Sequence, residues 1–211
     1  MTAGPAIRTA GRAARQPRKT GSCRTWPALA LGVALAALWS GSAGAQGSDE
    51  PRPFAVEAID PPQPAPELAF LDQKGHATNL ADFRGRVVVL NLWATWCPPC
   101  ISEMPSLDRL ASRLAEEPFS IVAVSLDREG KRVVDAFYHR AGLAALPQYF
   151  DPRGRVAKDL ATTGLPVTVV IDHEGREIGR LNGSIDWSSA EALGYLQPLI
   201  ARARAARSAG Q

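Results

Sequence analysis

A seven-residue run, apolar except for Asn91, that leads into two closely spaced cysteines is the feature that most constrains the fold. Val87–Trp93 is rich in β-branched side chains, which predicts a buried strand. A helical pattern begins at Pro98, so the chain passes from strand to helix within a few residues. Cys97 and Cys100 lie at this junction, three residues apart. In a first helical turn this spacing places both side chains on one face, close enough for a disulfide.

The position of the two cysteines predicts reversible sulfur chemistry. Unpaired backbone N–H groups and the positive end of the helix favour a thiolate at Cys97. A second thiol one turn behind it, Cys100, can resolve a mixed disulfide, which is the minimal requirement for thiol–disulfide exchange. The alternatives are an inert disulfide or half of a zinc site. Zinc needs two more ligands, and the three histidines, His76, His139 and His173, are scattered along the chain, so we expect neither metal nor cofactor.

The N-terminal residues predict export from the cytoplasm. The first 45 residues contain six basic residues and no acidic one, and an apolar stretch from Ala28 to Trp39 precedes the small residues Ala43-Gly44-Ala45. This pattern is typical of a signal peptide cleaved near Ala45 or, if it is retained, of a signal anchor that tethers the chain to the inner membrane. Both outcomes place the remaining chain in the periplasm. The basic balance belongs to this leader, so we expect no nucleic-acid partner.

The exported part divides by composition into three segments. Residues 46–66 carry six prolines and predict either an extended linker or an ordinary disordered terminus. Residues 67–203 alternate predicted strands and helices as one α/β domain, and residues 204–211 form a C-terminal tail. The predicted strands are Leu68–Leu71, Ala77–Asn79, Val87–Trp93, Phe119–Leu126, Val167–Ile171 and Glu177–Leu181. The predicted helices begin at Pro98 and span Lys131–Ala141, Val156–Ala161 and Ser189–Ala203.

Four short motifs, in this order and spacing, resemble one known family. They are Trp93–Cys100, Glu103-Met104-Pro105, Gly164–Thr168 and Ile171-Asp172. From about Leu68 to Leu199 the chain is similar to the thioredoxin-like TlpA/ResA family of exported thiol–disulfide oxidoreductases. The resemblance implies a thioredoxin fold: a central mixed sheet flanked by helices, with an N-terminal β-hairpin and a central strand–helix insertion within Phe119–Asp151.

The resemblance also implies roles for individual residues. Cys97 would be the exposed attacking thiol and Cys100 the more buried resolving thiol. Glu103 matches a buried acid of the family that shuttles protons to the cysteine pair, although by spacing alone it could equally face water and complement the helix dipole. Asn91 stands where thioredoxin itself has a buried aspartate as proton carrier, so the proton transfer is expected to fall to Glu103.

A substrate-binding surface is expected around the cysteines. The resemblance implies that the bond between Leu165 and Pro166 is cis and faces the cysteines, where the backbone could pair with an extended substrate. Trp96 and Pro98 flank Cys97 and are predicted to contribute to the same surface.

The predicted function is reduction of protein disulfides by a Cys-Pro-Pro-Cys dithiol. Pro98 and Pro99 offer no side-chain donor to Cys97, which favours the reducing end of the range of potentials of this fold. The family suggests apocytochrome c or copper-site assembly proteins as partners, with a membrane thiol-reducing protein as electron donor. Two other functions remain as alternatives: a thiol peroxidase of the peroxiredoxin group and a copper-binding chaperone.

Overall fold

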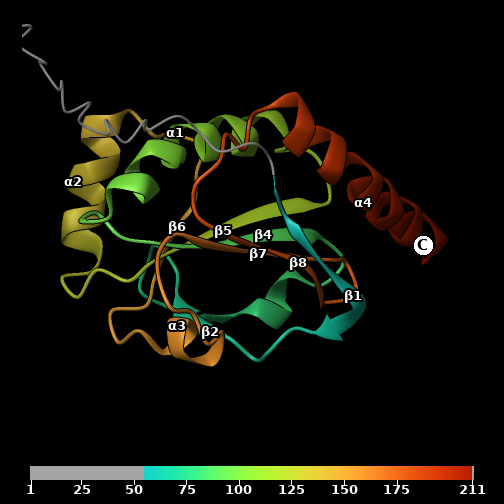
Figure 1. Ribbon diagram of the computed structural model, residues 1–211, viewed down its shortest axis with the longest axis horizontal. Coiled ribbons are helices and arrows are strands. Elements are labelled where there is room, and N and C mark those ends of the chain that lie inside the picture. Colours follow the sequence, from blue (N-terminus) through green and yellow to red (C-terminus); the bar gives the residue numbers. More distant parts are fainter. Residues whose placement is uncertain (1–54, 211) are drawn as a thin grey trace, which may run out of the picture. The chain divides into compact units, whose positions relative to one another are not determined.

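A mixed sheet of eight strands forms the centre of the structure, a computed structural model that describes residues 55–210 (Figure 1). The predicted export signal, residues 1–45, and the first part of the proline-rich segment lie outside the described residues. Within residues 55–210, no helix combines the length and the hydrophobicity needed to cross a membrane. The strands, in chain order, are β1 Glu57–Pro64, β2 Ala69–Leu71, β3 Ala77–Asn79, β4 Val87–Trp93, β5 Phe119–Ser125, β6 Gln148–Phe150, β7 Val167–Ile171 and β8 Arg176–Asn182. The helices are η1 Leu80–Phe83, α1 Pro98–Arg113, α2 Lys131–Ala141, α3 Arg155–Asp159 and α4 Ala190–Ala209.

The strand order across the sheet is β1-β8-β7-β4-β5-β6-β2-β3. The central strand β4 pairs in parallel with β5 on one side and antiparallel with β7 on the other. All seven residues of β4 are buried, as expected for a β-branched run covered on both faces. Strands β2 and β3 form the predicted N-terminal hairpin. The structure therefore confirms the α/β class and the mixed sheet flanked by helices.

Alternate residues of β4 belong to two separate cores. Val87, Val89 and Trp93 pack with the buried sides of α1, α2 and α4. Val88 and Leu90 pack on the opposite face, where α3 and η1 contribute. Figure 1 shows the same division, with α1, α2 and α4 above the sheet and α3 below it. Because side chains alternate along a strand, Asn91 lies on the face that α1 covers.

The segment 57–64 was predicted to be part of a proline-rich linker, and this prediction is wrong. It forms β1, an edge strand that pairs antiparallel with β8. Prolines are tolerated there because an edge strand needs hydrogen bonds on one side only. The register shifts between Ala58 and Gln63, so the prolines Pro61 and Pro62 fall in an irregular part of the pairing.

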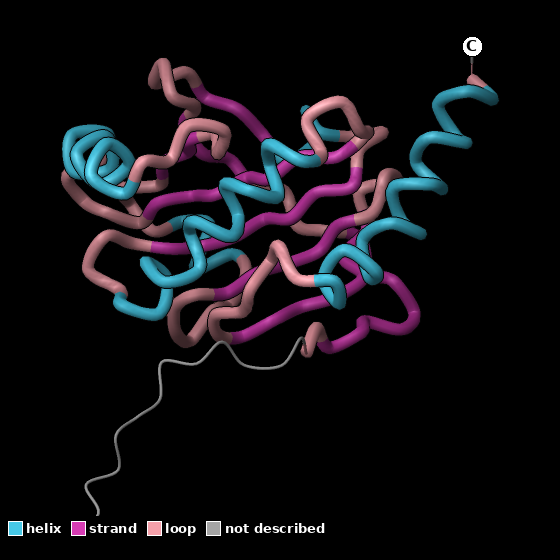
Figure 2. Tube along the Cα trace, turned by 90° about the horizontal axis from the view of Figure 1, so that it is seen from above, coloured by secondary structure: helices cyan, strands magenta, loops and turns pink. Residues whose placement is uncertain are grey.

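Two further elements differ from the prediction. Strand β6, Gln148–Phe150, pairs in parallel with the end of β5 and was not predicted, because three residues show no period and, unlike Ala77–Asn79, they do not follow a hairpin turn from another predicted strand. The central segment therefore holds a strand, a helix and this second short strand. Helix α4 continues to Ala209, so most of the predicted 204–211 tail is helical. Alanine and arginine are good helix formers, and Figure 2 shows these last turns extending past the strands.

Candidate active site

Cys97 and Cys100 form the predicted disulfide at the carboxyl end of β4. Their Cα atoms are 5.3 Å apart. Cys97 is the N-cap residue of α1, with an extended backbone, and Cys100 lies in the first helical turn. The backbone N–H of Cys97 donates to the carbonyl of Ala94, closing the short turn between strand and helix. The strand-to-helix junction therefore holds both sulfur atoms at one end of the sheet.

The start of α1 directs its free backbone donor at the first sulfur. Pro98 and Pro99 occupy the first two helical positions and have no N–H. The N–H of Cys100 points at Cys97 Sγ, 3.3 Å away, and the N–H of Ile101 donates to the carbonyl of Cys97. In the reduced protein, this N–H group and the positive end of the helix would be available to stabilise a thiolate at Cys97.

Cys97 is more covered than predicted. Its exposed fraction is 4%, against 0% for Cys100. The order agrees with the predicted one, but in the disulfide form Cys97 is not an exposed residue, since its sulfur is bonded to Cys100 and the adjacent core covers it. The solvent-exposed side chains at this site are instead those of nearby residues. Trp96 is 67% exposed and Ile101 36%, and they are the exposed large hydrophobic residues of the described part.

Trp96, the residue before Cys97, borders a groove of about 560 Å³. Leu126 and Val133 contribute apolar side chains to its lining, and Asp127, Arg128 and Glu129 contribute charged ones. Pro98 is exposed on the same turn as Trp96, so both predicted contact residues face solvent.

Glu103 lies one turn beyond Cys100 and is buried, with 2% of its surface exposed. Burial raises the pKa of Glu103 from 4.5 to about 8, because a carboxylate loses its hydration there. Hydrogen bonding by the Asn91 side chain, the Ile185 backbone and the Trp187 side chain opposes this rise. The prediction of a buried acid behind the cysteines therefore agrees with the geometry, and the solvent-facing alternative does not.

Two polar residues of the sheet lie beneath this acid. Asn91 Nδ2 donates to Glu103 Oε1 at 2.8 Å and to Thr168 Oγ1 at 3.0 Å. Asn91 on β4 and Thr168 on β7 are cross-strand partners in register, and both are fully buried. Ser106, one turn along α1, accepts a hydrogen bond from the backbone N–H of Trp187, which fixes the segment after β8 against the helix.

Asp127 anchors the turn that precedes the cysteines. Its carboxylate accepts hydrogen bonds from the backbone N–H of Thr95 at 2.9 Å and from the Thr95 hydroxyl at 2.7 Å. Ser125 donates a third, at 2.8 Å. Asp127 follows β5, the parallel neighbour of β4, so the carboxyl ends of the two strands bring it beside the turn. The Asp127 side chain therefore restrains Thr95 and the turn that contains Trp96 and Cys97.

The bond between Leu165 and Pro166 is cis, as predicted. Val167 pairs with Leu92 near the end of β4, so the proline lies at the same end of the sheet as the disulfide. The carbonyl of Pro166 accepts a hydrogen bond from the N–H of Gly183 and is occupied within the fold. A substrate strand that pairs here would therefore use the backbone of Leu165, which is half-buried, whereas Pro166 itself is buried.

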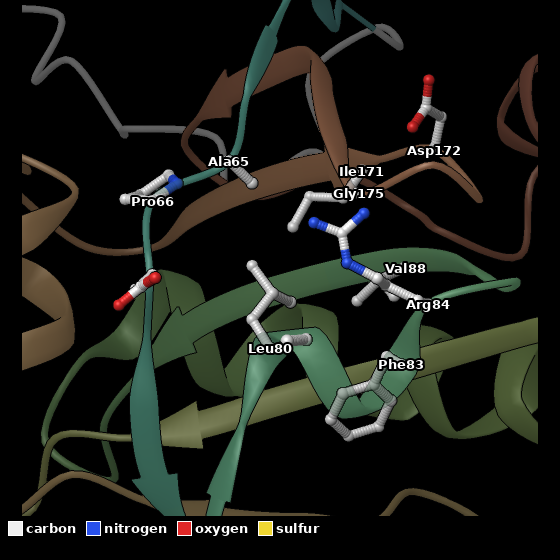
Figure 3. Close-up of a pocket in the computed structure, with 11 residues that line it drawn as sticks. Ala65, Pro66, Leu80, Phe83, Arg84, Val88, Ile171, Asp172 and Gly175 are labelled. Carbon is white, nitrogen blue, oxygen red and sulfur yellow. The ribbon is translucent and has the colours of Figure 1, made fainter.

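A second cavity, of about 110 Å³, lies at the other end of the central strands (Figure 3). Val88, near the start of β4, and Ile171, at the end of β7, line it together with Leu80 and Phe83. The guanidinium of Arg84 points across this space towards the turn at Gly175, as the close-up shows. These residues lie at the opposite end of β4 from Cys97 and do not contribute to the disulfide site.

Sequence analysis missed three residues that shape the site: Asp127, Thr168 and Trp187. A signal existed for two of them. Thr168 is the single polar residue within the apolar run 167–171, and Asp127 is a charged residue just after a buried strand. Trp187 gave no such signal, because its position beside Glu103 depends on how the chain returns from β8 to α4.

The chain matches the AhpC/TSA family over residues 61–176. Among curated proteins it is 38% identical over 111 residues to the thiol-disulfide oxidoreductase ResA of Geobacillus kaustophilus, a match that covers 53% of this chain and 63% of that protein. It is 35% identical over 161 residues to a thiol:disulfide interchange protein DsbE homolog of Paracoccus denitrificans, covering 75% of this chain and 86% of the relative.

Solved structures give the same fold. A secreted thiol-disulfide isomerase from Corynebacterium glutamicum superposes with a TM-score of 0.60 at 25% identity, and the match covers 72% of this chain and 95% of that one. The predicted thioredoxin fold is therefore confirmed.

Proposed function

The chain belongs to the AhpC/TSA family and, within it, groups with the thiol–disulfide oxidoreductases of the ResA and DsbE type, and from this premise we propose that it reduces protein disulfides. The observation that carries the proposal is the Cys97–Cys100 disulfide at the N-terminus of a helix, with the buried acid Glu103 one turn behind it. The dithiol form of this pair is the reductant.

The reaction transfers two electrons from the dithiol to a target. The thiolate of Cys97 attacks a target disulfide, which forms a mixed disulfide and releases the first target thiolate. Cys100 then loses its proton, and its thiolate attacks Cys97 Sγ. This step releases the second target thiolate and forms the Cys97–Cys100 disulfide. An external dithiol restores the reduced form by the reverse sequence.

Glu103 is proposed to exchange protons with Cys100. With a pKa of about 8 in the oxidised protein, the carboxyl is mostly protonated at neutral pH. It can therefore supply a proton to the Cys100 thiolate when a donor opens the disulfide, and accept it again when Cys100 attacks. Trp96, Pro98 and the backbone at Leu165 and Pro166 are proposed to contact the target, because they surround the disulfide at this end of the sheet.

A periplasmic setting is proposed, and the leader and the relatives support it. An export signal in residues 1–45 would deliver the domain to the periplasm, either free or tethered. No NADPH-dependent reductase operates there, so the donor is proposed to be a membrane protein that passes reducing equivalents outwards. Targets are proposed among apocytochrome c and copper-site assembly proteins. The relatives compared are named for disulfide exchange, which does not favour a peroxidase or a copper chaperone.

Trapping of the mixed disulfide tests the proposal. Replacing Cys100 with serine leaves the Cys97 adduct unresolved, and mass spectrometry of the adduct identifies the target. The matched control is Cys97→Ser, which should trap nothing. The purified wild-type protein, reduced beforehand, should also reduce insulin. If Cys100→Ser captures no disulfide-containing protein, or Cys97→Ser captures as much, the assigned roles are wrong.

A further inference from the structure

We propose that Asn91 is a positioning residue for the proton-transferring acid: its amide holds the Glu103 carboxyl beside the cysteine pair and stabilises its charged form. This inference rests on the proposed function only for its consequence in catalysis. The contact itself is a feature of the fold.

The orientation of the Asn91 amide is determined by its two acceptors. The Nδ2 group has two N–H donors, and one points at Glu103 Oε1 and the other at Thr168 Oγ1. A flipped amide would place its carbonyl oxygen against the Glu103 carboxyl and could not donate to its charged form. Thr168 therefore fixes Asn91, and Asn91 in turn fixes Glu103.

The Asn91 side chain leaves one of its own polar atoms unpaired, so its hydrogen bond to Glu103 differs from an ordinary contact within the sheet. Asn91 Oδ1 is buried and has no hydrogen-bond partner among the described residues. A buried carbonyl oxygen without a partner is destabilising, and an apolar side chain of similar shape would avoid it. The stabilising interaction that Asn91 makes with α1 is its hydrogen bond to Glu103.

No charged neighbour in the described part of the chain lowers the pKa of Glu103. Asn91 on β4 and, from the segment after β8, the Ile185 backbone and the Trp187 side chain donate to it, and Cys100 lies one turn before it on α1. Within residues 55–210, no Asp, His, Lys or Arg contributes to its pKa. Hydrogen bonds are thus the interactions that oppose the desolvation of the carboxylate, and the Asn91 side chain provides the largest of them.

The chain also offers a matched control. Gln148 is a buried amide on the same face of the sheet, in register with Asn91 through Ala123 and two strands away. Gln148 is not among the groups that shift the pKa of Glu103. Replacing Gln148 with methionine removes a buried amide of the sheet but leaves the surroundings of the acid intact.

The test is a carboxyl titration of the oxidised full-length protein by 13C NMR, with labelled glutamate and Glu103→Gln to assign the signal. Asn91→Leu should raise the pKa of Glu103 by about one unit or more, because the charged form loses its main donor. Thr168→Val should raise it by less, because Asn91 remains but is no longer fixed. Gln148→Met should change it by no more than about 0.3 unit.

Each outcome decides the inference. It is overturned if Asn91→Leu shifts the titration by less than about 0.3 unit, or if Gln148→Met shifts it as much. If Asn91→Leu does not fold, Thr168→Val decides in its place: a rise beyond the Gln148→Met value supports the inference and no rise overturns it. The titration uses no substrate. A protein that failed to reduce disulfides would refute the proposed function, but the titration would still test the role of Asn91.

Discussion

Replacing Glu103 with glutamine is expected to change how the stability of the oxidised protein depends on pH. In the folded protein the pKa of Glu103 is raised from 4.5 to about 8 by burial, whereas in the unfolded chain it returns to the ordinary value. Between these two values the folded state holds a proton that the unfolded state has lost. The free energy of unfolding therefore falls as the pH rises from about 4.5 to about 8 and levels off above that value.

The size of the effect follows from the width of this window. Each pH unit within it costs about 1.4 kcal/mol, so ionised Glu103 destabilises the fold by at most about 5 kcal/mol above pH 8. Glutamine keeps the shape and the oxygen that accepts from Asn91 Nδ2, but has no charge to bury. The advantage of Glu103→Gln over the wild type should thus grow by several kcal/mol between pH 5 and pH 9.

Urea unfolding of the oxidised proteins at pH 5, 7 and 9 measures this difference. The disulfide keeps both cysteines from titrating, and the contributions of the histidines cancel in the comparison. Glu116→Gln is the matched control, because Glu116 is an exposed glutamate, and its difference from the wild type should stay nearly constant. A constant difference for Glu103→Gln as well would mean that the buried carboxyl is ionised throughout, and the reasoning about its environment would be refuted.

Two other substitutions test the surroundings of the disulfide, and a third tests a stabilising contact elsewhere on α1. Trp96→Ala should raise KM for insulin severalfold without lowering the melting temperature, because Trp96 is exposed; an unchanged KM would remove it from the contact surface. Asp127→Ala should destabilise the protein by about 1–3 kcal/mol in urea and slow alkylation of reduced Cys97, since Thr95 loses its partner; an unaltered alkylation rate would contradict the anchoring role. Asp108→Ala should cost a similar amount of stability, because Asp108 accepts three backbone N–H bonds from residues 144–146, while insulin reduction by the folded protein stays at the wild-type rate.

The elements predicted from sequence were those whose pattern is local and strong. The bounds of β4 were predicted correctly because its run of β-branched and other apolar residues is interrupted only by Asn91, and those of α2 because Gly130 and Gly142 flank a clear helical pattern. The cysteine pair was found for the same reason, since its spacing and its place before a helix can be read from eight residues. The cis bond at Pro166 came only from the family resemblance.

What sequence analysis missed depends on contacts between distant residues. Strand β1 contains prolines that read as a linker, and it becomes a strand because β8 offers an edge for it to pair with. Asn91 and Thr168 are 77 residues apart, and only the register of β4 with β7 makes them neighbours. Asp127 reaches Thr95 through the pairing of β4 with β5. Local patterns hold no information on such pairs.

The position of the acid explains why an amide at residue 91 is useful. A carboxylate on β4 would lie beneath the helix, whereas Glu103 lies on α1 itself, one turn from Cys100. Moving the acid to the helix leaves the strand position free to supply a donor, and an amide there supplies two N–H groups without adding a charge. Asparagine at 91 and glutamate at 103 therefore work as a pair, since the amide offsets part of the desolvation that burial imposes on the acid. An aspartate at 91 beside Glu103 would instead place two acids in contact, and they would share one proton through coupled titration.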